Sequence, residues 1–171
     1  ANEYISVPAS ADLTFGTGDF SVSFWVMRTV NDDRRPFINN RQNPGTDGEW
    51  AIEVYDMPDR VEIHSGQFIL LTANTLLVPS VWNHVAVTRS GNTLAVYING
   101  SSAGDTTIYK DFNESNDLQI GRDILSASDL WGKSLAGNLD EIRIYNRALS
   151  GEEIGAAYLN GLPSSSTQAM L

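Results

Sequence analysis

Short segments in which apolar and polar residues alternate recur along this chain, and they constrain its fold more than any other feature. In residues 20–26 every second side chain from Phe20 to Val26 is apolar, so the apolar ones share one face of an extended strand. Comparable segments lie at residues 50–55, 61–63, 82–88, 93–98, 118–121 and 139–145. Short strands at this spacing predict an all-β fold, in which two antiparallel sheets pack as a jelly-roll sandwich.

Turn-forming residues separate these segments. Residues 91–92 (Gly-Asn) and 99–100 (Asn-Gly) favour tight turns, and each pair follows a predicted strand. Residues 56–59 (Asp-Met-Pro-Asp) form a connection short enough to join residues 50–55 to the next strand as a hairpin.

One stretch near the C-terminus has helical spacing instead. Ser150 suits the N-cap, two glutamates follow it in the first turn, and Ile154 shares a helical face with Tyr158. Gly161 and Pro163 end the pattern. The sandwich is therefore expected to carry one short C-terminal helix.

Length and composition limit the partners that this chain can have. Its 171 residues suit one domain, and we expect the sandwich to occupy residues 1–163 and a Ser/Thr-rich tail or linker start to occupy residues 164–171. Lys and Arg number 11 against 21 for Asp and Glu, and the net charge of −10 repels nucleic acid and anionic membranes. No apolar run approaches the ~18 residues of a membrane span, so no membrane insertion is expected. Cysteine is absent, which excludes thiol catalysis and cysteine-based zinc sites.

Five motifs in a fixed order resemble a known family. They are residues 20–26 (Phe-Ser-Val-Ser-Phe-Trp-Val), 82–89 (Trp-Asn-His-Val-Ala-Val-Thr-Arg), 94–100 (Leu-Ala-Val-Tyr-Ile-Asn-Gly), 118–123 (Leu-Gln-Ile-Gly-Arg-Asp) and 137–150. Together they resemble the laminin-G-like domains of the concanavalin A-like lectin/glucanase superfamily. The resemblance implies a jelly roll with a concave and a convex face. It does not imply one function, because this fold hosts lectins, carbohydrate-binding modules, adhesion domains and glycoside hydrolases.

No catalytic pair is expected. Glycoside hydrolysis generally needs two carboxylates on one cleft, and in the glucanase branch they follow a Glu-x-Asp-x-x-Glu pattern that this chain lacks. Glu49 and Glu53 could share a strand face, whereas the adjacent Asp140 and Glu141 must point to opposite faces. The sequence therefore predicts a protein that is not an enzyme.

The resemblance implies a structural calcium ion, held by the N-terminal segment, an early loop and the aspartate of the last strand. Asp140 matches the last-strand position, Asp19 lies in the early loop, and Asn2 or Glu3 could complete the shell. The alternative is that Asp19 and Asp140 only accept hydrogen bonds from turn amides.

The predicted hairpin suggests a ligand site. Alternation places Glu53 and Tyr55 on one face of their strand, and Glu62 and His64 on the same face of the next. Arg41 could join them from the preceding strand. A tyrosine for stacking, two carboxylates and an imidazole would suit sugar hydroxyls, and the alternative is an ordinary solvated face.

Three further features are ambiguous. Trp131 lies in a loop without strand periodicity and is a second candidate for stacking on a sugar. Four of the eleven basic residues fall within 28–41, either as a solvated strand end or as a pocket for an acidic sugar. His84 lies inside a strand motif, which favours a structural role.

These features together predict a non-catalytic carbohydrate-binding module of a larger secreted protein, attached to catalytic or adhesion modules. The Ser/Thr-rich tail and the missing catalytic pattern favour that reading. An extracellular adhesion or protein-interaction domain is the alternative, and a glycoside-active enzyme comes third.

Overall fold

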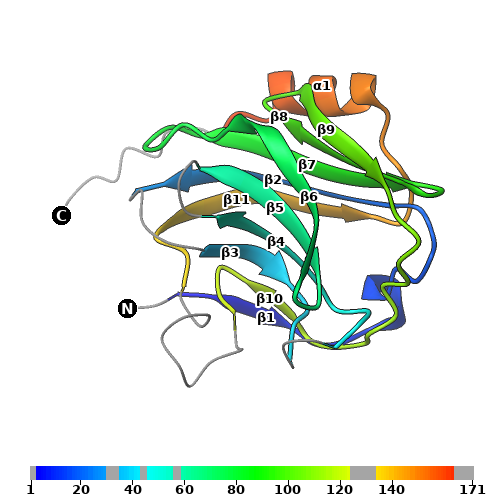
Figure 1. Ribbon diagram of the computed structural model, residues 1–171. Helices are drawn as coiled ribbons and strands as arrows, with labels where there is room; N and C mark the ends of the chain where they lie inside the picture. The colour runs from blue at the N-terminus through cyan, green and yellow to red at the C-terminus, as the bar shows by residue number, and fades with distance from the viewer. Residues whose placement is uncertain (1–2, 30–34, 43–45, 56–58, 124–133, 164–171) are drawn as a thin grey trace.

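The computed structural model describes residues 3–29, 35–42, 46–55, 59–123 and 134–163. Two antiparallel sheets pack face to face, and one helix lies across the outside of one of them (Figure 1). The first sheet has the strand order β1 (Ile5–Val7), β10 (Leu118–Ile120), β3 (Arg35–Asn39), β4 (Trp50–Tyr55), β5 (Arg60–Ser65) and β6 (Phe68–Leu76). The second has the order β11 (Gly137–Tyr145), β2 (Phe20–Arg28), β7 (Asn83–Ser90), β8 (Thr93–Ile98) and β9 (Ser101–Thr107). A short 3₁₀ helix, η1 (Ala11–Leu13), precedes β2. The predicted two-sheet antiparallel sandwich is confirmed.

The core lies between the two sheets and follows the predicted alternation. The alternate apolar residues of β2 are all buried and face the buried residues of β4 and β5, such as Ile52 and Ile63; they are Phe20, Val22, Phe24 and Val26. Burying these side chains supplies the main driving force for the sandwich, at about 25 cal/mol per Å² of apolar surface.

The outer face of β2 is buried as well, because helix α1 (Gly151–Asn160) covers it. Trp25 stacks on Tyr158 of the helix with ring centroids 5.6 Å apart, and Ile154 is fully buried. The predicted N-cap is confirmed: the Ser150 side chain accepts the Glu153 backbone N–H, and the Glu153 carboxylate accepts the Ser150 N–H. The short C-terminal helix thus covers part of the outer face of the second sheet.

The predicted turns are present too. Gly91 joins β7 to β8 with a φ of 56°, and Asn99 and Gly100 join β8 to β9 with φ values of 51° and 77°. Within the described residues, no helix is both long and apolar enough to cross a membrane.

Candidate functional site

The hairpin predicted for residues 50–65 is present, and it gathers several of the predicted ligand residues. β4 and β5 pair with Glu53 opposite Glu62 and Ala51 opposite His64. The polar side chains lie on the face turned away from the core, because the apolar residues of both strands pack inward. Arg41 follows the end of β3 and reaches the same face.

These side chains form what we term the buried charged cluster: Arg41, Glu53, Glu62, His64 and Asp123. His64 Nε2 lies 2.9 Å from Glu53 Oε1 and 3.0 Å from Glu62 Oε2. Arg41 Nη1 lies 3.0 Å from Glu53 Oε2 and 3.4 Å from Asp123 Oδ2. All five residues are buried, and none is more than 5% exposed. The predicted face therefore exists, but its described side chains contact one another and present no open surface to a sugar.

Three members of the cluster could hold a metal ion. The donor atoms of Glu53, Glu62 and His64 all lie within 4.8 Å of one another. Two carboxylate oxygens and one imidazole nitrogen suit zinc and other first-row divalent ions better than calcium, which takes oxygen ligands. The Arg41 guanidinium contacts Glu53 and places a permanent positive charge beside the group, which opposes a further cation.

The residues predicted to bind calcium are not brought together. Asp140 pairs with Trp25, whereas Asp19 precedes the first residue of β2, so the two carboxylates lie about 20 Å apart along that strand. Each accepts a backbone N–H, Asp19 from Gly91 at 2.7 Å and Asp140 from Glu141 at 2.8 Å. Two residues so far apart do not fit one ion. Asn2 lies outside the described residues, and the presence of a structural calcium ion stays a prediction.

Two predicted ligand residues cannot be placed fully. Tyr55 ends β4 opposite Arg60, which agrees with the predicted pairing, but its side chain is outside the described part of the chain. Trp131 lies in residues 124–133, also outside it. Their role in ligand binding stays a prediction.

Three arginines of the basic segment 28–41 form hydrogen bonds or ion pairs with other residues of the protein. Arg28 pairs with Asp59 in a buried contact, and Arg35 Nη1 donates to the Ser134 carbonyl at 2.9 Å. Arg41 belongs to the buried charged cluster. These three side chains match neither a solvated strand end nor an open pocket for an acidic sugar, and Arg34 lies outside the described residues.

His84 lies in an aromatic cluster under α1. Its ring centroid is 5.3 Å from that of Trp25 and 6.3 Å from that of Tyr158. Burial, and secondarily the positive charge of Arg143, lowers the His84 pKa from 6.5 to about 4. A neutral imidazole packed between aromatic rings has the structural role that its position in a strand motif suggests.

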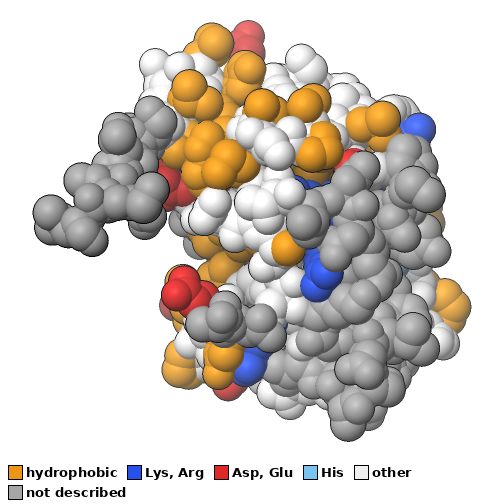
Figure 2. Space-filling model, turned by 90° about the vertical axis from the view of Figure 1, so that its left-hand side faces the viewer, with side chains coloured by type: hydrophobic (Ala, Val, Ile, Leu, Met, Phe, Trp, Pro, Cys, Tyr) orange, Lys and Arg blue, Asp and Glu red, His pale blue; other side chains and the backbone are white. Residues whose placement is uncertain are grey.

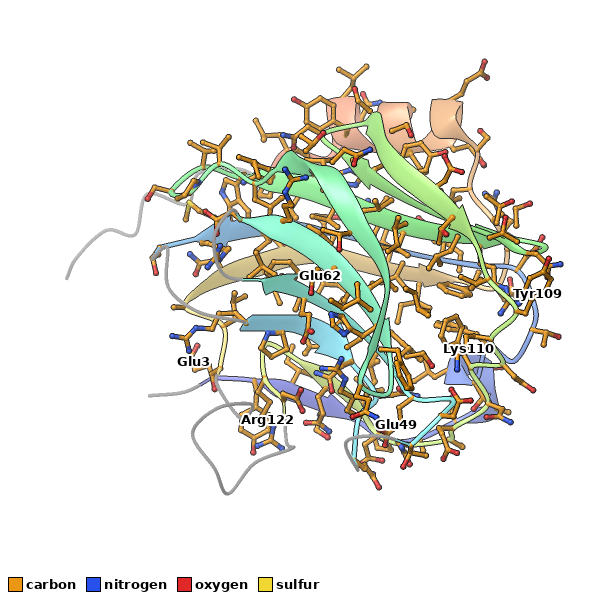
Figure 3. All side chains as sticks on the ribbon, viewed as in Figure 1. Glu3, Glu49, Glu62, Tyr109, Lys110 and Arg122 are labelled. Carbon is orange, nitrogen blue, oxygen red and sulfur yellow. The ribbon has the colours of Figure 1, made fainter. Side chains whose placement is uncertain are left out.

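An open groove lies at the end of the sandwich where the chain leaves β9. Figure 3 labels two residues of this end, Tyr109 and Lys110. Its volume is about 710 Å³, against about 340 Å³ and 360 Å³ for the hollows beside α1 and β1. The aromatic ring of Tyr109 stands at its edge and is 83% exposed. The residues that line the groove are Asp47, Ile69, Leu70, Thr107, Ile108, Tyr109, Lys110, Asp111 and Asn113.

Lys110 connects the two sides of this groove. Its Nζ lies 2.5 Å from Asp47 Oδ1 and 5.7 Å from the ring centroid of Phe68, which is itself 58% exposed. The groove thus combines the exposed Tyr109 with an ammonium, carboxylates and an amide, and the exposed Phe68 ring lies beside its Lys110. Surfaces of this composition bind ligands that have both an apolar face and hydroxyl groups.

The end of the molecule turned away from Tyr109 has a different character. Figure 2 shows hydrophobic side chains over its upper part. We take the groove at the Tyr109 end as the candidate site, because its lining belongs to the described residues.

Sequence reasoning missed Tyr109, Lys110 and Phe68. The sequence did contain an indication of Tyr109, because it is an aromatic residue in a polar connection without strand periodicity. The same reasoning made Trp131 a candidate for stacking on a sugar. Phe68 gave no such signal, because an aromatic residue at a strand start normally indicates core.

Several solved structures share this fold. The chain superimposes with a TM-score of 0.72 on a Bacteroides ovatus protein to which carbohydrate binding has been assigned, at 20% identity, covering 91% of this chain and 44% of that one. Domain 4 of an extracellular arabinanase from Geobacillus stearothermophilus, in complex with arabinotriose, gives 0.66 at 20% identity, covering 90% and 71%. The family 40 carbohydrate-binding module of a Ruminococcus gnavus sialidase, bound to sialyllactose, gives 0.68 at 12% identity, covering 91% and 96%. At these identities the likeness shows the fold alone, and the chain spans less than half of the Bacteroides protein.

Sequence comparison leads to a family as well. No curated protein matches the chain as a relative. A family model does match residues 1–155, which is most of the chain and includes all of both sheets. The chain therefore belongs to the laminin G-like domain family of the concanavalin A-like lectin/glucanases superfamily.

Proposed function

We propose that this chain is a non-catalytic carbohydrate-binding module of a larger secreted protein. The observation that carries the proposal is the open groove beside Tyr109, on a sandwich of the lectin-like superfamily. Structures with the same fold hold arabinotriose and sialyllactose as domains of larger proteins, which supports a carbohydrate as the ligand. Such a module keeps an attached domain close to a polysaccharide by raising its effective concentration.

The two carboxylates that could share a strand face are placed unfavourably for catalysis. Glu49 and Glu53 are both about 1% exposed. Glu49 Oε1 accepts the Gln42 N–H at 2.8 Å and an Asn116 side-chain N–H at 3.1 Å, whereas Glu53 contacts Arg41 and His64. An acid and a nucleophile for glycoside hydrolysis must reach the scissile bond, and carboxylates in closed networks do not.

The test is affinity electrophoresis of the chain in gels that contain single polysaccharides, with a reducing-sugar assay on the same polymers. We expect retardation by at least one polysaccharide and no release of reducing ends. Migration unchanged by every polymer would contradict carbohydrate binding, and release of reducing sugar would contradict the non-catalytic role.

A further inference from the structure

We propose that the groove beside Tyr109 is the binding site for a neutral oligosaccharide and that the Tyr109 ring is its stacking platform. This inference rests on the proposed function and deepens it, because it assigns both the place of binding and the class of sugar. It replaces the hairpin face as the preferred site, since the described side chains of that face are buried.

The segment that carries Tyr109 is anchored at both ends. Ile108 and Phe112 are buried in the core, and the Ile108 N–H donates to the Asn92 carbonyl at 2.8 Å. Phe112 and Gly16 exchange two backbone hydrogen bonds, each 2.9 Å long. The three residues between the anchors are therefore displayed from fixed points, which lowers the entropy lost when a ligand binds.

A buried arginine also fixes this segment through hydrogen bonds to its backbone. Arg89 Nη1 donates to the Lys110 carbonyl at 2.8 Å and to the Gly16 carbonyl at 3.1 Å, and its Nε donates to the Gly91 carbonyl at 2.9 Å. Arg89 is 1% exposed, so its guanidinium acts as a structural clamp on backbone carbonyls and does not face a ligand. Because the clamp acts on the backbone, it leaves the side chains of Tyr109 and Lys110 available to the groove.

The exposed rings suit the apolar face of a sugar. Tyr109 lines the groove and is 83% exposed, and Phe68, which contacts Lys110 beside the groove, is 58% exposed. Aromatic rings stack on the C–H face of a pyranose or furanose, while Asp47, Lys110 and Asn113 supply acceptors and donors for its hydroxyls. The volume of about 710 Å³ falls within the roughly 300–1,000 Å³ typical of small-ligand sites.

The charges favour a neutral sugar over an acidic one. The groove is lined by two carboxylates, Asp47 and Asp111, and by one ammonium, Lys110, which already contacts Asp47. The arginines that could have bound a uronate or sulfate, such as Arg28 and Arg41, are buried and paired with carboxylates elsewhere. A net charge of −10 over the chain adds to the repulsion of polyanions.

The experiment compares the parent with three variants. Gels contain arabinan, xylan, mannan or starch as neutral polymers, and polygalacturonate or alginate as acidic ones. Tyr109→Ala removes the platform, Tyr109→Phe keeps the ring, and Tyr4→Ala removes an aromatic residue that is 48% exposed and stacks on Arg122 at a distant site (Figure 3). Isothermal titration with oligosaccharides from the retarding polymer gives dissociation constants, and melting curves verify that each variant folds.

We expect retardation by a neutral polymer, a loss of affinity of about tenfold or more in Tyr109→Ala, and less than about threefold change in Tyr109→Phe and Tyr4→Ala. If a polymer retards parent and Tyr109→Ala equally, the module function stands and the groove assignment is wrong. Retardation by acidic polymers alone overturns the assignment of the sugar class. If no polymer retards the parent, both the groove assignment and the proposed function are overturned.

Discussion

Acidification should destabilise this protein through His84. The imidazole is 2% exposed and packs against Trp25 and Tyr158, with no hydrogen-bond partner at Nδ1 among the described residues. Burial, together with the charge of Arg143, lowers its pKa from 6.5 to about 4. In the unfolded chain the same imidazole regains an ordinary pKa, so between these two values the unfolded state binds a proton that the folded state does not.

The sign and size of the effect follow from this difference. The stability that depends on neutral His84 is fully present above the unfolded pKa of 6.5 and is lost progressively as the pH falls toward the folded value of about 4. At about 1.4 kcal/mol per pKa unit, the complete shift corresponds to a loss of about 3 kcal/mol. Most of this loss, about 2 to 3 kcal/mol, should occur between about pH 7 and pH 4.5.

The assay is urea unfolding of the parent and of His84→Phe at both pH values. Phenylalanine keeps an aromatic ring beside Trp25 and cannot be protonated. All other titratable groups are the same in both proteins, so the difference between the two pH-dependent losses isolates His84. Equal losses of unfolding free energy in parent and variant would refute the reasoning, as would a His84 pKa near 6.5 measured by NMR titration.

Three further outcomes are expected. Ser150→Ala should lower the free energy of unfolding by about 1 kcal/mol in urea titration, because it removes the acceptor for the Glu153 N–H; a change below about 0.3 kcal/mol would contradict the capping role. Arg41→Ala should cost about 3–5 kcal/mol in the same assay, because it withdraws the guanidinium that contacts the buried carboxylates of Glu53 and Asp123, and a nearly neutral result would contradict this ion pairing. If Glu53, Glu62 and His64 hold a metal ion, a chelator should lower the melting temperature of the parent and not that of His64→Gln; a parent that melts alike with and without chelator would show that no ion stabilises it.

The sequence predicted those strands whose pattern reports burial directly. In β2, alternation from Phe20 onward identified the core face, and the Asn99-Gly100 turn was read correctly from its residue types. β9 (Ser101–Thr107) was not singled out, because glycine, serine and aspartate have low strand propensity. Its conformation is imposed by pairing with β8, which is not visible in a local pattern. β6 was missed for the opposite reason, since its apolar residues do not alternate.

The sequence did not predict the groove, and it predicted the hairpin face only in part. Period-two alternation correctly placed Glu53, Glu62 and His64 on one face of the hairpin. Whether that face is open depends on what lies above it, which is a property of distant segments and not of the strands. A charged strand face normally indicates solvent, yet here ion pairs with Arg41 and Asp123 accompany its burial. The alternation of side chains therefore predicted direction but not exposure.

The groove proposed as the ligand site lies apart from the core that stabilises the fold. Ile108 and Phe112 anchor their segment in the core, whereas Tyr109 is 83% exposed, so substitutions between the anchors remove little buried surface. If the groove binds the ligand as proposed, its lining residues can change without loss of the sandwich. On the same proposal, the sugar is selected by the short connection after β9 and by the start of β6, because those two segments meet where Lys110 lies over the Phe68 ring.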